Sequence, residues 1–167
     1  NSGSRMRPGS ESWYSFSIYI PQGAWIPPAN GPWVSLAQVH QFGESGPEVQ
    51  FYYRAPGFRF ELTDPNSPTG IGSALGVNLL SARAMQGRWT DIVMQARWSR
   101  SNDGFINVWV NNRQMVAYTG ATTNSDERLY FKYGLYRYLT ERCGGPCPEQ
   151  TVYFRDVARG PTRASLN

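Results

Sequence analysis

The single histidine and the single lysine of this chain each lie in a short segment in which polar and apolar residues alternate. His40 follows Gln38 at a spacing of two, and Lys132 precedes Tyr136 and Tyr138 in a tyrosine-rich segment. Successive side chains of a β-strand point to opposite faces, so residues two apart share a face. If the two strands are neighbours in one sheet, an amide, an imidazole, an ammonium and phenols converge on one groove.

Length and composition indicate the fold that positions these groups. The chain has 167 residues, of which 14% are aromatic, with 17 glycines and 12 prolines. This length favours a single domain over residues 1–167 with a sizeable core. Short aromatic-rich segments separated by turn residues, without a convincing helical pattern, are typical of an all-β antiparallel sandwich or barrel.

Alternation and turn residues predict nine or ten strands. The expected strands are 12–21, 33–41, 49–54, 58–62, 77–80, 91–99, 105–111, 113–118, 130–139 and 151–159. A hairpin is predicted across Ala55-Pro56-Gly57, and Asn102-Asp103-Gly104 is a strong hairpin signal. The residues from Pro161 onward are expected to fray.

Net charge indicates the class of partner. The formal charge is +4, and fifteen of the sixteen cationic side chains are arginines. The planar guanidinium matches carboxylates and phosphates, which favours an anionic partner. An ordinary solvated surface explains the same charge equally well. Basicity permits nucleic-acid binding, but no recognised motif supports it. No apolar run is long enough to cross a membrane, and no signal peptide is visible.

The two cysteines flank a Gly-Gly-Pro turn, in Cys143-Gly144-Gly145-Pro146-Cys147. They could close a short disulfide loop, which fits a secreted or periplasmic protein, or remain free thiols. A metal site is disfavoured because two further ligands at a suitable spacing are absent.

Several segments resemble a known family in their order and approximate spacing. They are residues 13–21 (WYSFSIYIP), 38–40 (QVH), 87–93 (GRWTDIV), 103–111 (DGFINVWVN), 130–137 (YFKYGLYR) and 152–157 (VYFRDV). Together they look like the jelly-roll polysaccharide lyases, and they are most similar to the glucuronan lyase and heparin-lyase-like group. The segments 38–40 and 131–136 are similar to the Gln-Ile-His and Tyr-Phe-Lys-Ala-Gly-x-Tyr motifs of jelly-roll alginate lyases.

The resemblance implies a concanavalin-like β-sandwich with a concave groove and a set of site residues. Catalytic roles are expected for Tyr136, His40 and Gln38. Substrate binding is expected from Lys132, Arg137, Tyr138, Arg54 and one of two N-terminal arginines, Arg5 or Arg7. Family members usually have an Arg-x-Glu strand near the N-terminus, which is not found here, so the two arginines cannot be told apart by alignment. Arg59 lies on the same hairpin as Arg54, where a solvated face is an equal alternative.

The implied reaction is β-elimination on a uronate-containing polysaccharide, of glucuronan or alginate type. A group must neutralise the C6 carboxylate, a base must take the C5 proton, and an acid must protonate the leaving O4. Gln38 and an arginine suit the first role. In glucuronate or mannuronate the C5 proton and O4 lie on one side, so Tyr136 could serve as both base and acid. In guluronate they lie on opposite sides, which favours His40 as the base.

The alternatives are a non-catalytic carbohydrate-binding module and a glycoside hydrolase on the same sandwich. A binding module would not need Gln38, His40, Lys132 and Tyr136 together. A hydrolase needs two opposed carboxylates, which the candidate strands lack. No cofactor is required by the lyase reaction, and Asp156 is a weak candidate ligand for a structural calcium ion. The expected partner is an anionic polysaccharide, with no nucleic acid and no membrane, and the protein is expected to be a monomer.

Overall fold

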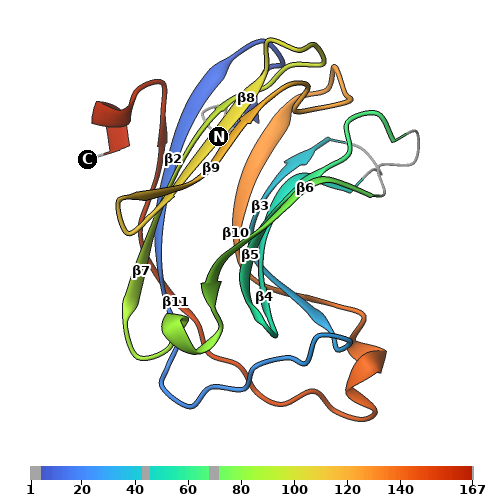
Figure 1. Ribbon diagram of the computed structural model, residues 1–167, viewed down its shortest axis with the longest axis vertical. Helices are drawn as coiled ribbons and strands as arrows, with labels where there is room; N and C mark the ends of the chain where they lie inside the picture. Colours follow the sequence, from blue (N-terminus) through green and yellow to red (C-terminus); the bar gives the residue numbers. More distant parts are fainter. Residues whose placement is uncertain (1–4, 43–45, 68–71, 167) are drawn as a thin grey trace.

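Two curved antiparallel sheets stack face to face in the computed structural model, which describes residues 5–42, 46–67 and 72–166 (Figure 1). One sheet has six strands in the order β1-β10-β3-β4-β5-β6, and the other has five in the order β11-β2-β7-β8-β9. The predicted all-β sandwich is therefore confirmed. Strands far apart in sequence become neighbours, above all β3 and β10, which carry the histidine and the lysine.

Each predicted strand is present, but the strand predicted at 77–80 spans 73–81 and the strand predicted at 91–99 spans 89–97. The strands are β1 (Arg5–Met6), β2 (Glu11–Tyr19), β3 (Trp33–Gln41), β4 (Pro47–Arg54), β5 (Gly57–Thr63), β6 (Ser73–Ser81), β7 (Trp89–Arg97), β8 (Phe105–Val110), β9 (Arg113–Thr119), β10 (Leu129–Tyr138) and β11 (Tyr153–Gly160). Helical structure among the described residues is limited to three 3₁₀ turns, η2 (Arg83–Met85), η3 (Thr140–Cys143) and η4 (Arg163–Leu166).

The core lies between the sheets and is built from the apolar half of each alternating strand. On β2, Tyr14, Phe16 and Ile18 are buried, while the residues between them face outward or are partly exposed. Phe51 and Phe60 of the six-stranded sheet contact each other with ring centroids 5.3 Å apart, and Phe51 also meets Phe16 across the core. Burying this apolar surface is the main force that holds the sheets together.

Two features near the chain ends differ from the expectation. The pair Arg5–Met6 forms β1, an edge strand next to β10 that is too short to show alternation in the sequence. The segment after Pro161 was expected to fray, but it forms η4, whose Ser165 hydroxyl bonds the Thr162 carbonyl oxygen at 2.6 Å. No helix in the described part of the chain is long and apolar enough to span a membrane.

Candidate functional site

The open face of the six-stranded sheet carries a groove of ≈ 550 Å³. Its lining includes four of the predicted site residues from two neighbouring strands, Gln38 and His40 of β3 and Lys132 and Tyr136 of β10. Tyr138 lines the same groove. The imidazole and the phenol therefore lie on one face of one sheet, outside the apolar core, as the alternation in the two segments predicts.

Strand register arranges the groove residues in rows that run across the sheet. One row is Tyr136, Ser35, Tyr52, Arg59 and Asn78; a second is Lys132, Gln38, Gln50, Glu61 and Gly76. A third row begins with Arg5, Tyr130 and His40. A β-bulge at Leu36 of β3 turns Ser35 to the same face as Gln38 and His40, although its position number has the opposite parity.

His40 is held as a neutral imidazole. Its Nδ1 atom lies 2.8 Å from the carbonyl oxygen of Gln41. A carbonyl oxygen only accepts, so Nδ1 carries a proton, and in the neutral form of the ring Nε2 keeps its lone pair. Burial and, to a lesser extent, the positive charge of Lys132 lower the pKa of His40 from its usual 6.5, against the opposing effect of the Gln41 carbonyl. Tyr130 stacks on the ring with centroids 5.6 Å apart. An uncharged imidazole of this kind can accept a proton near neutral pH.

Lys132 places a positive charge between two tyrosines. Its Nζ atom lies 5.7 Å from the ring centroid of Tyr136 and 5.9 Å from that of Tyr130. Burial lowers the pKa of Lys132, because the protein removes part of the water around its charge. No carboxylate lies within 4.0 Å of this ammonium among the residues that the structure describes. The charge is therefore available to stabilise a phenolate on Tyr136 or an anionic substrate.

Gln38 presents an unused polar group at the floor of the groove. The residue is 6% exposed, and its Oε1 atom has no hydrogen-bond partner among the described residues. An unsatisfied buried polar atom costs free energy, and such atoms are rare in folded proteins. The unpartnered Oε1 atom is an acceptor, so a sugar hydroxyl could satisfy it, whereas the amide N–H groups of the same side chain can donate to a bound carboxylate.

A second β-bulge, at Gly134 and Leu135 of β10, lies between Lys132 and Tyr136. Gly134 has φ of 138°, a conformation that other residues rarely adopt, and a Cβ there would contact nothing within 4 Å. The backbone conformation, and not the space, is what requires glycine at this position. The bulge sets the direction in which the Tyr136 side chain leaves the strand.

Replacing Gly134 by alanine is expected to lower both stability and activity. The strained φ should cost on the order of 1–3 kcal/mol in the free energy of unfolding, measured by denaturant titration. Gly145→Ala is the matched control, because Gly145 has open space around it and no positive φ. Equal stability losses in the two variants would show that the conformation of Gly134 is not special.

Arg54, one of the expected substrate-binding residues, does not line the groove itself but contacts a residue that does. Its guanidinium carbon lies 3.9 Å from the ring centroid of Trp33, which lines the groove, and 5.5 Å from that of Tyr52. The cation–π contacts fix the side chain without neutralising its charge. As with Lys132, the described residues place no carboxylate within ion-pair distance of this arginine.

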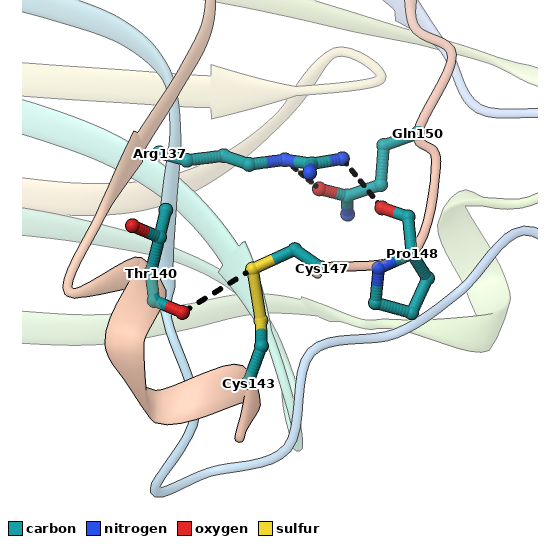
Figure 2. The surroundings of a disulfide bond; sticks show 6 residues. All are labelled: Arg137, Thr140, Cys143, Cys147, Pro148 and Gln150. Carbon is teal, nitrogen blue, oxygen red and sulfur yellow. Dashed lines mark hydrogen bonds between the residues drawn. A yellow bond between two sulfur atoms is a disulfide. The ribbon is translucent and has the colours of Figure 1, made fainter. Parts of the chain in front are cut away.

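Arg137 is not brought to the groove, contrary to the expectation that it binds substrate. It pairs with Val34, a core residue, so it lies on the opposite face of β10. Its guanidinium donates to Gln150 Oε1 at 3.0 Å and to the carbonyl oxygen of Pro148 at 2.7 Å (Figure 2). Alternation already separates position 137 from 136 and 138, and the side chain instead anchors the loop that follows the strand.

That loop contains the two cysteines. Cys143 and Cys147 form a disulfide bond beside Arg137, with Cα atoms 5.3 Å apart (Figure 2). Gln150, which accepts from Arg137, also donates to the carbonyl oxygen of Trp25 at 3.4 Å. The disulfide holds the segment after β10 together, and these hydrogen bonds attach that segment to the loop before β3. The two strands that carry the site are therefore linked to each other at this end as well as along their length.

The two N-terminal arginines differ in position. Arg5 pairs through its backbone with Tyr130, the residue that stacks on His40, while its side chain lies outside the described part of the structure. Arg7 is exposed after β1, and its carbonyl oxygen closes a turn with Ser10. Arg7 does not line the groove. Of the two, Arg5 is the one whose backbone lies in a strand row that includes His40.

The structure does not support a calcium site at Asp156. This residue lies on the five-stranded sheet, where its carboxylate pairs with the neighbouring Arg155 at 3.3 Å. The described residues include no group of three or more histidine, cysteine, aspartate or glutamate side chains that could hold a metal ion. A single exposed carboxylate offers too few oxygen ligands for calcium.

Sequence reasoning missed several groove residues. Tyr130, which stacks on His40 beside the groove, could have been found, because it lies an even number of residues from Lys132 and Tyr136 on the same strand. The others depend on the pairing of β3, β4 and β5, which no local pattern specifies. They are Trp33, Ser35, Gln50, Glu61 and Thr63.

Comparisons with known proteins agree with the fold and the groove. A family model described as "Polysaccharide lyase" matches residues 1–158. A search of curated proteins found no match. An endo-β-1,4-glucuronan lyase from the fungus Trichoderma reesei is similar with a TM-score of 0.74 and 19% identity, over 96% of this chain and 72% of that chain.

Two further solved structures share the architecture. An alginate lyase from Pseudomonas aeruginosa gives a TM-score of 0.63 at 20% identity, over 92% of this chain and 66% of that chain. An alginate lyase from a Chlorella virus gives 0.57 at 12% identity, over 92% and 72% of the two chains. At these identities the structural similarity establishes the shared fold.

Proposed function

Because this chain belongs to the polysaccharide lyase family, we propose that its groove cleaves a uronate-containing polysaccharide of glucuronan or alginate type by β-elimination. The observation that carries the proposal is the joint presence of Gln38, His40, Lys132 and Tyr136 along one groove. Solved structures of similar fold include a glucuronan lyase and alginate lyases, which supports a uronate polymer as substrate.

The charges in the groove support an anionic polymer. Lys132 and Arg54 have no carboxylate partner within 4.0 Å among the described residues. Unpaired cations on a concave surface attract polyanions, and they are neutralised when a carboxylate binds. A uronate chain carries one carboxylate on every sugar, so it can meet both cations in a single bound stretch.

The first chemical step requires the negative charge of the C6 carboxylate on the reacting sugar to be partly neutralised by hydrogen bonds or a nearby cation. We assign this role to the side-chain amide N–H of Gln38, with help from the Lys132 ammonium, while the unpartnered Oε1 atom of Gln38 is left to accept from a sugar hydroxyl. Hydrogen bonds to this carboxylate become stronger as negative charge moves onto it from C5. They therefore stabilise the enolate-like transition state more than the ground state.

Proton transfer is assigned to Tyr136 and His40. A base takes the C5 proton, the electron pair forms the C4–C5 double bond, and the C4–O4 bond breaks as an acid protonates O4. Tyr136 donates to O4, and Lys132 supports its phenolate form. For glucuronate or mannuronate the same tyrosine takes the C5 proton, whereas for guluronate the Nε2 atom of His40 is suited to take it.

Ultraviolet absorbance tests the reaction directly. Incubation with glucuronan and with alginate should produce a rising near-ultraviolet absorbance, because elimination creates a C4–C5 double bond conjugated with the C6 carboxylate. Reducing ends without this absorbance would indicate hydrolysis. Binding without either product would leave only a carbohydrate-binding module and would overturn the proposed lyase activity.

The choice of base predicts how His40→Ala depends on substrate. If His40 is the base for guluronate, the variant should lose about 10²–10⁴-fold in kcat on guluronate blocks. The loss on glucuronan or mannuronate blocks should be smaller, because Tyr136 serves both steps there. Wild-type kcat/KM on guluronate should rise as pH increases through a value below 6.5, since the lowered pKa of His40 governs the acidic limb. Equal losses on all polymers would contradict this division of roles.

We further infer that the protein acts outside the cytoplasm. A disulfide between Cys143 and Cys147 persists in oxidising compartments, which supports a secreted or periplasmic location. Polysaccharides too large to enter a cell would be met there. Cell fractionation followed by thiol labelling would test this inference, because cytoplasmic protein with reactive thiols would contradict it.

A further inference from the structure

The groove extends onto β5, where Glu61 lines it. Arg59 lies two residues before Glu61, on the same face of β5 and next to the lining residues. Arg59 lies in the row that begins with Tyr136, and Glu61 lies in the row of Lys132 and Gln38. Three strand spacings of about 4.8 Å separate β10 from β5, so Arg59 lies about 14 Å from Tyr136 along its row. That distance is longer than one sugar ring, and the proposed chemistry at Tyr136 does not use either residue.

Arg59 is fixed in place but lacks a counter-ion. Its guanidinium carbon lies 5.8 Å from the ring centroid of Tyr52, and its Nε atom is buried without a hydrogen-bond partner. The described residues include no carboxylate within 4.0 Å of it. Gly76 of β6 makes room for this side chain, because a Cβ at that position would lie 2.9 Å from the guanidinium nitrogen Nη2. An arginine placed in this way is suited to bind a carboxylate through its planar fork.

Glu61 introduces a negative charge into a groove that otherwise favours anions. Its Oε2 atom accepts a hydrogen bond from the Tyr52 hydroxyl at 3.3 Å, and no cation forms an ion pair with it in the described structure. A carboxylate repels the carboxylate of a bound uronate but accepts hydrogen bonds from sugar hydroxyls. Glu61 therefore favours one orientation of a sugar, with hydroxyls toward Glu61 and the carboxylate toward Arg59.

We propose that Arg59 and Glu61 form a distal subsite that binds a uronate residue remote from the scissile bond, Arg59 holding its carboxylate and Glu61 its hydroxyls. This inference rests on the proposed function, since it assumes a uronate polymer in the groove. The subsite fixes the register of the polymer over Tyr136. It also makes binding depend on chain length, because a short oligomer at the catalytic residues cannot reach β5.

Binding of oligomers to Tyr136→Phe, measured by calorimetry, tests the subsite without turnover. The probes are dimers and hexamers of glucuronate and of mannuronate. Adding Arg59→Ala should weaken hexamer binding about 10- to 100-fold, the usual effect of losing a charge-assisted hydrogen-bond pair, and leave dimer binding unchanged. Arg59→Lys should recover only part of the loss, because an ammonium lacks the fork. Glu61→Gln should reduce the difference in affinity between two uronate oligomers that differ in the orientation of their carboxylates.

Arg113→Ala is the matched control for charge, since Arg113 is an exposed arginine on β9 of the other sheet. If Arg59→Ala and Arg113→Ala weaken hexamer binding equally, the effect is general electrostatics and the subsite is refuted. Equal loss for dimers and hexamers also refutes it. A wild-type protein that binds hexamers through Arg59 but yields no unsaturated product would overturn the lyase proposal and keep the subsite, so the two failures are distinguishable.

Discussion

Replacing Tyr136 by phenylalanine is expected to lower kcat about 10²–10⁴-fold while the fold stays intact. The hydroxyl is assigned the proton transfer to O4, and removing one positioned acid or base usually costs a factor of this size. The side chain is 56% exposed, and the ring that faces Lys132 is retained in the variant. The stability should therefore change by no more than about 0.5 kcal/mol, and KM should change far less than kcat because the lost interaction belongs to the transition state.

Tyr153→Phe is the matched control for this experiment. Tyr153 is 54% exposed, similar to Tyr136, but it lies on β11 of the other sheet and packs against Tyr19. The control should keep full activity in the absorbance assay. A Tyr136→Phe variant that retains more than about a tenth of wild-type kcat would be incompatible with a general-acid role for this hydroxyl.

The site residues that the sequence predicted correctly are those whose shared strand face follows from the alternation of side chains along one strand. Gln38 and His40 share a face because no bulge interrupts β3 between them. Lys132 and Tyr136 also share a face, because the bulge between them does not change which side of β10 the even-numbered residues face. Whether β3 and β10 are neighbours depends on the fold, since residues about ninety positions apart must pair. The family resemblance supplied that information, and alternation alone did not.

The residues that sequence reasoning misplaced or missed depend on geometry that no local pattern contains. Arg137 was expected in the groove from the family resemblance, although alternation along β10 places it on the other face, where it binds Gln150 in the following loop. Glu61 reaches the groove only through the register of the β4–β5 hairpin, which sets it opposite Gln50. The bulge at Leu36 reverses parity within β3, and nothing in its sequence marks the extra residue.

A buried carboxyl group outside the groove predicts an unusual dependence of stability on pH. Glu48 of β4 is 3% exposed, and its Oε1 atom accepts a hydrogen bond from the Thr123 hydroxyl at 2.8 Å. Thr123 belongs to the segment between β9 and β10, and its own hydroxyl oxygen accepts from the backbone N–H of Ser125 at 3.1 Å. No cation forms an ion pair with Glu48 among the described residues. Burial therefore raises the pKa of Glu48 from 4.5 to about 7, and the Thr123 hydrogen bond only partly opposes this.

The sign of the effect follows from linkage between protonation and folding. A carboxyl whose pKa is higher in the folded state binds a proton more tightly there, so the folded state is favoured at low pH. This contribution is fully present below pH 4.5 and is lost as the pH rises through about 7. A shift of one pKa unit corresponds to about 1.4 kcal/mol. The contribution of Glu48 should therefore lower the free energy of unfolding by about 3 kcal/mol across this pH window.

Glu48→Gln removes the titration and keeps an acceptor for the Thr123 hydroxyl. At pH 8 the variant should be more stable than the wild type by up to about 3 kcal/mol, and at pH 4 the two should be nearly equal. Urea titrations at a series of pH values measure this difference, and Glu127→Gln, an exposed carboxyl of the same connecting segment, should leave the wild-type curve unchanged. If Glu48→Gln follows the wild type at every pH, or is less stable at pH 8, then Glu48 is not a desolvated carboxyl and its assigned burial against Thr123 is wrong. The predicted gain above neutral pH implies that the glutamate at this position weakens the connection that leads into β10 once it is ionised.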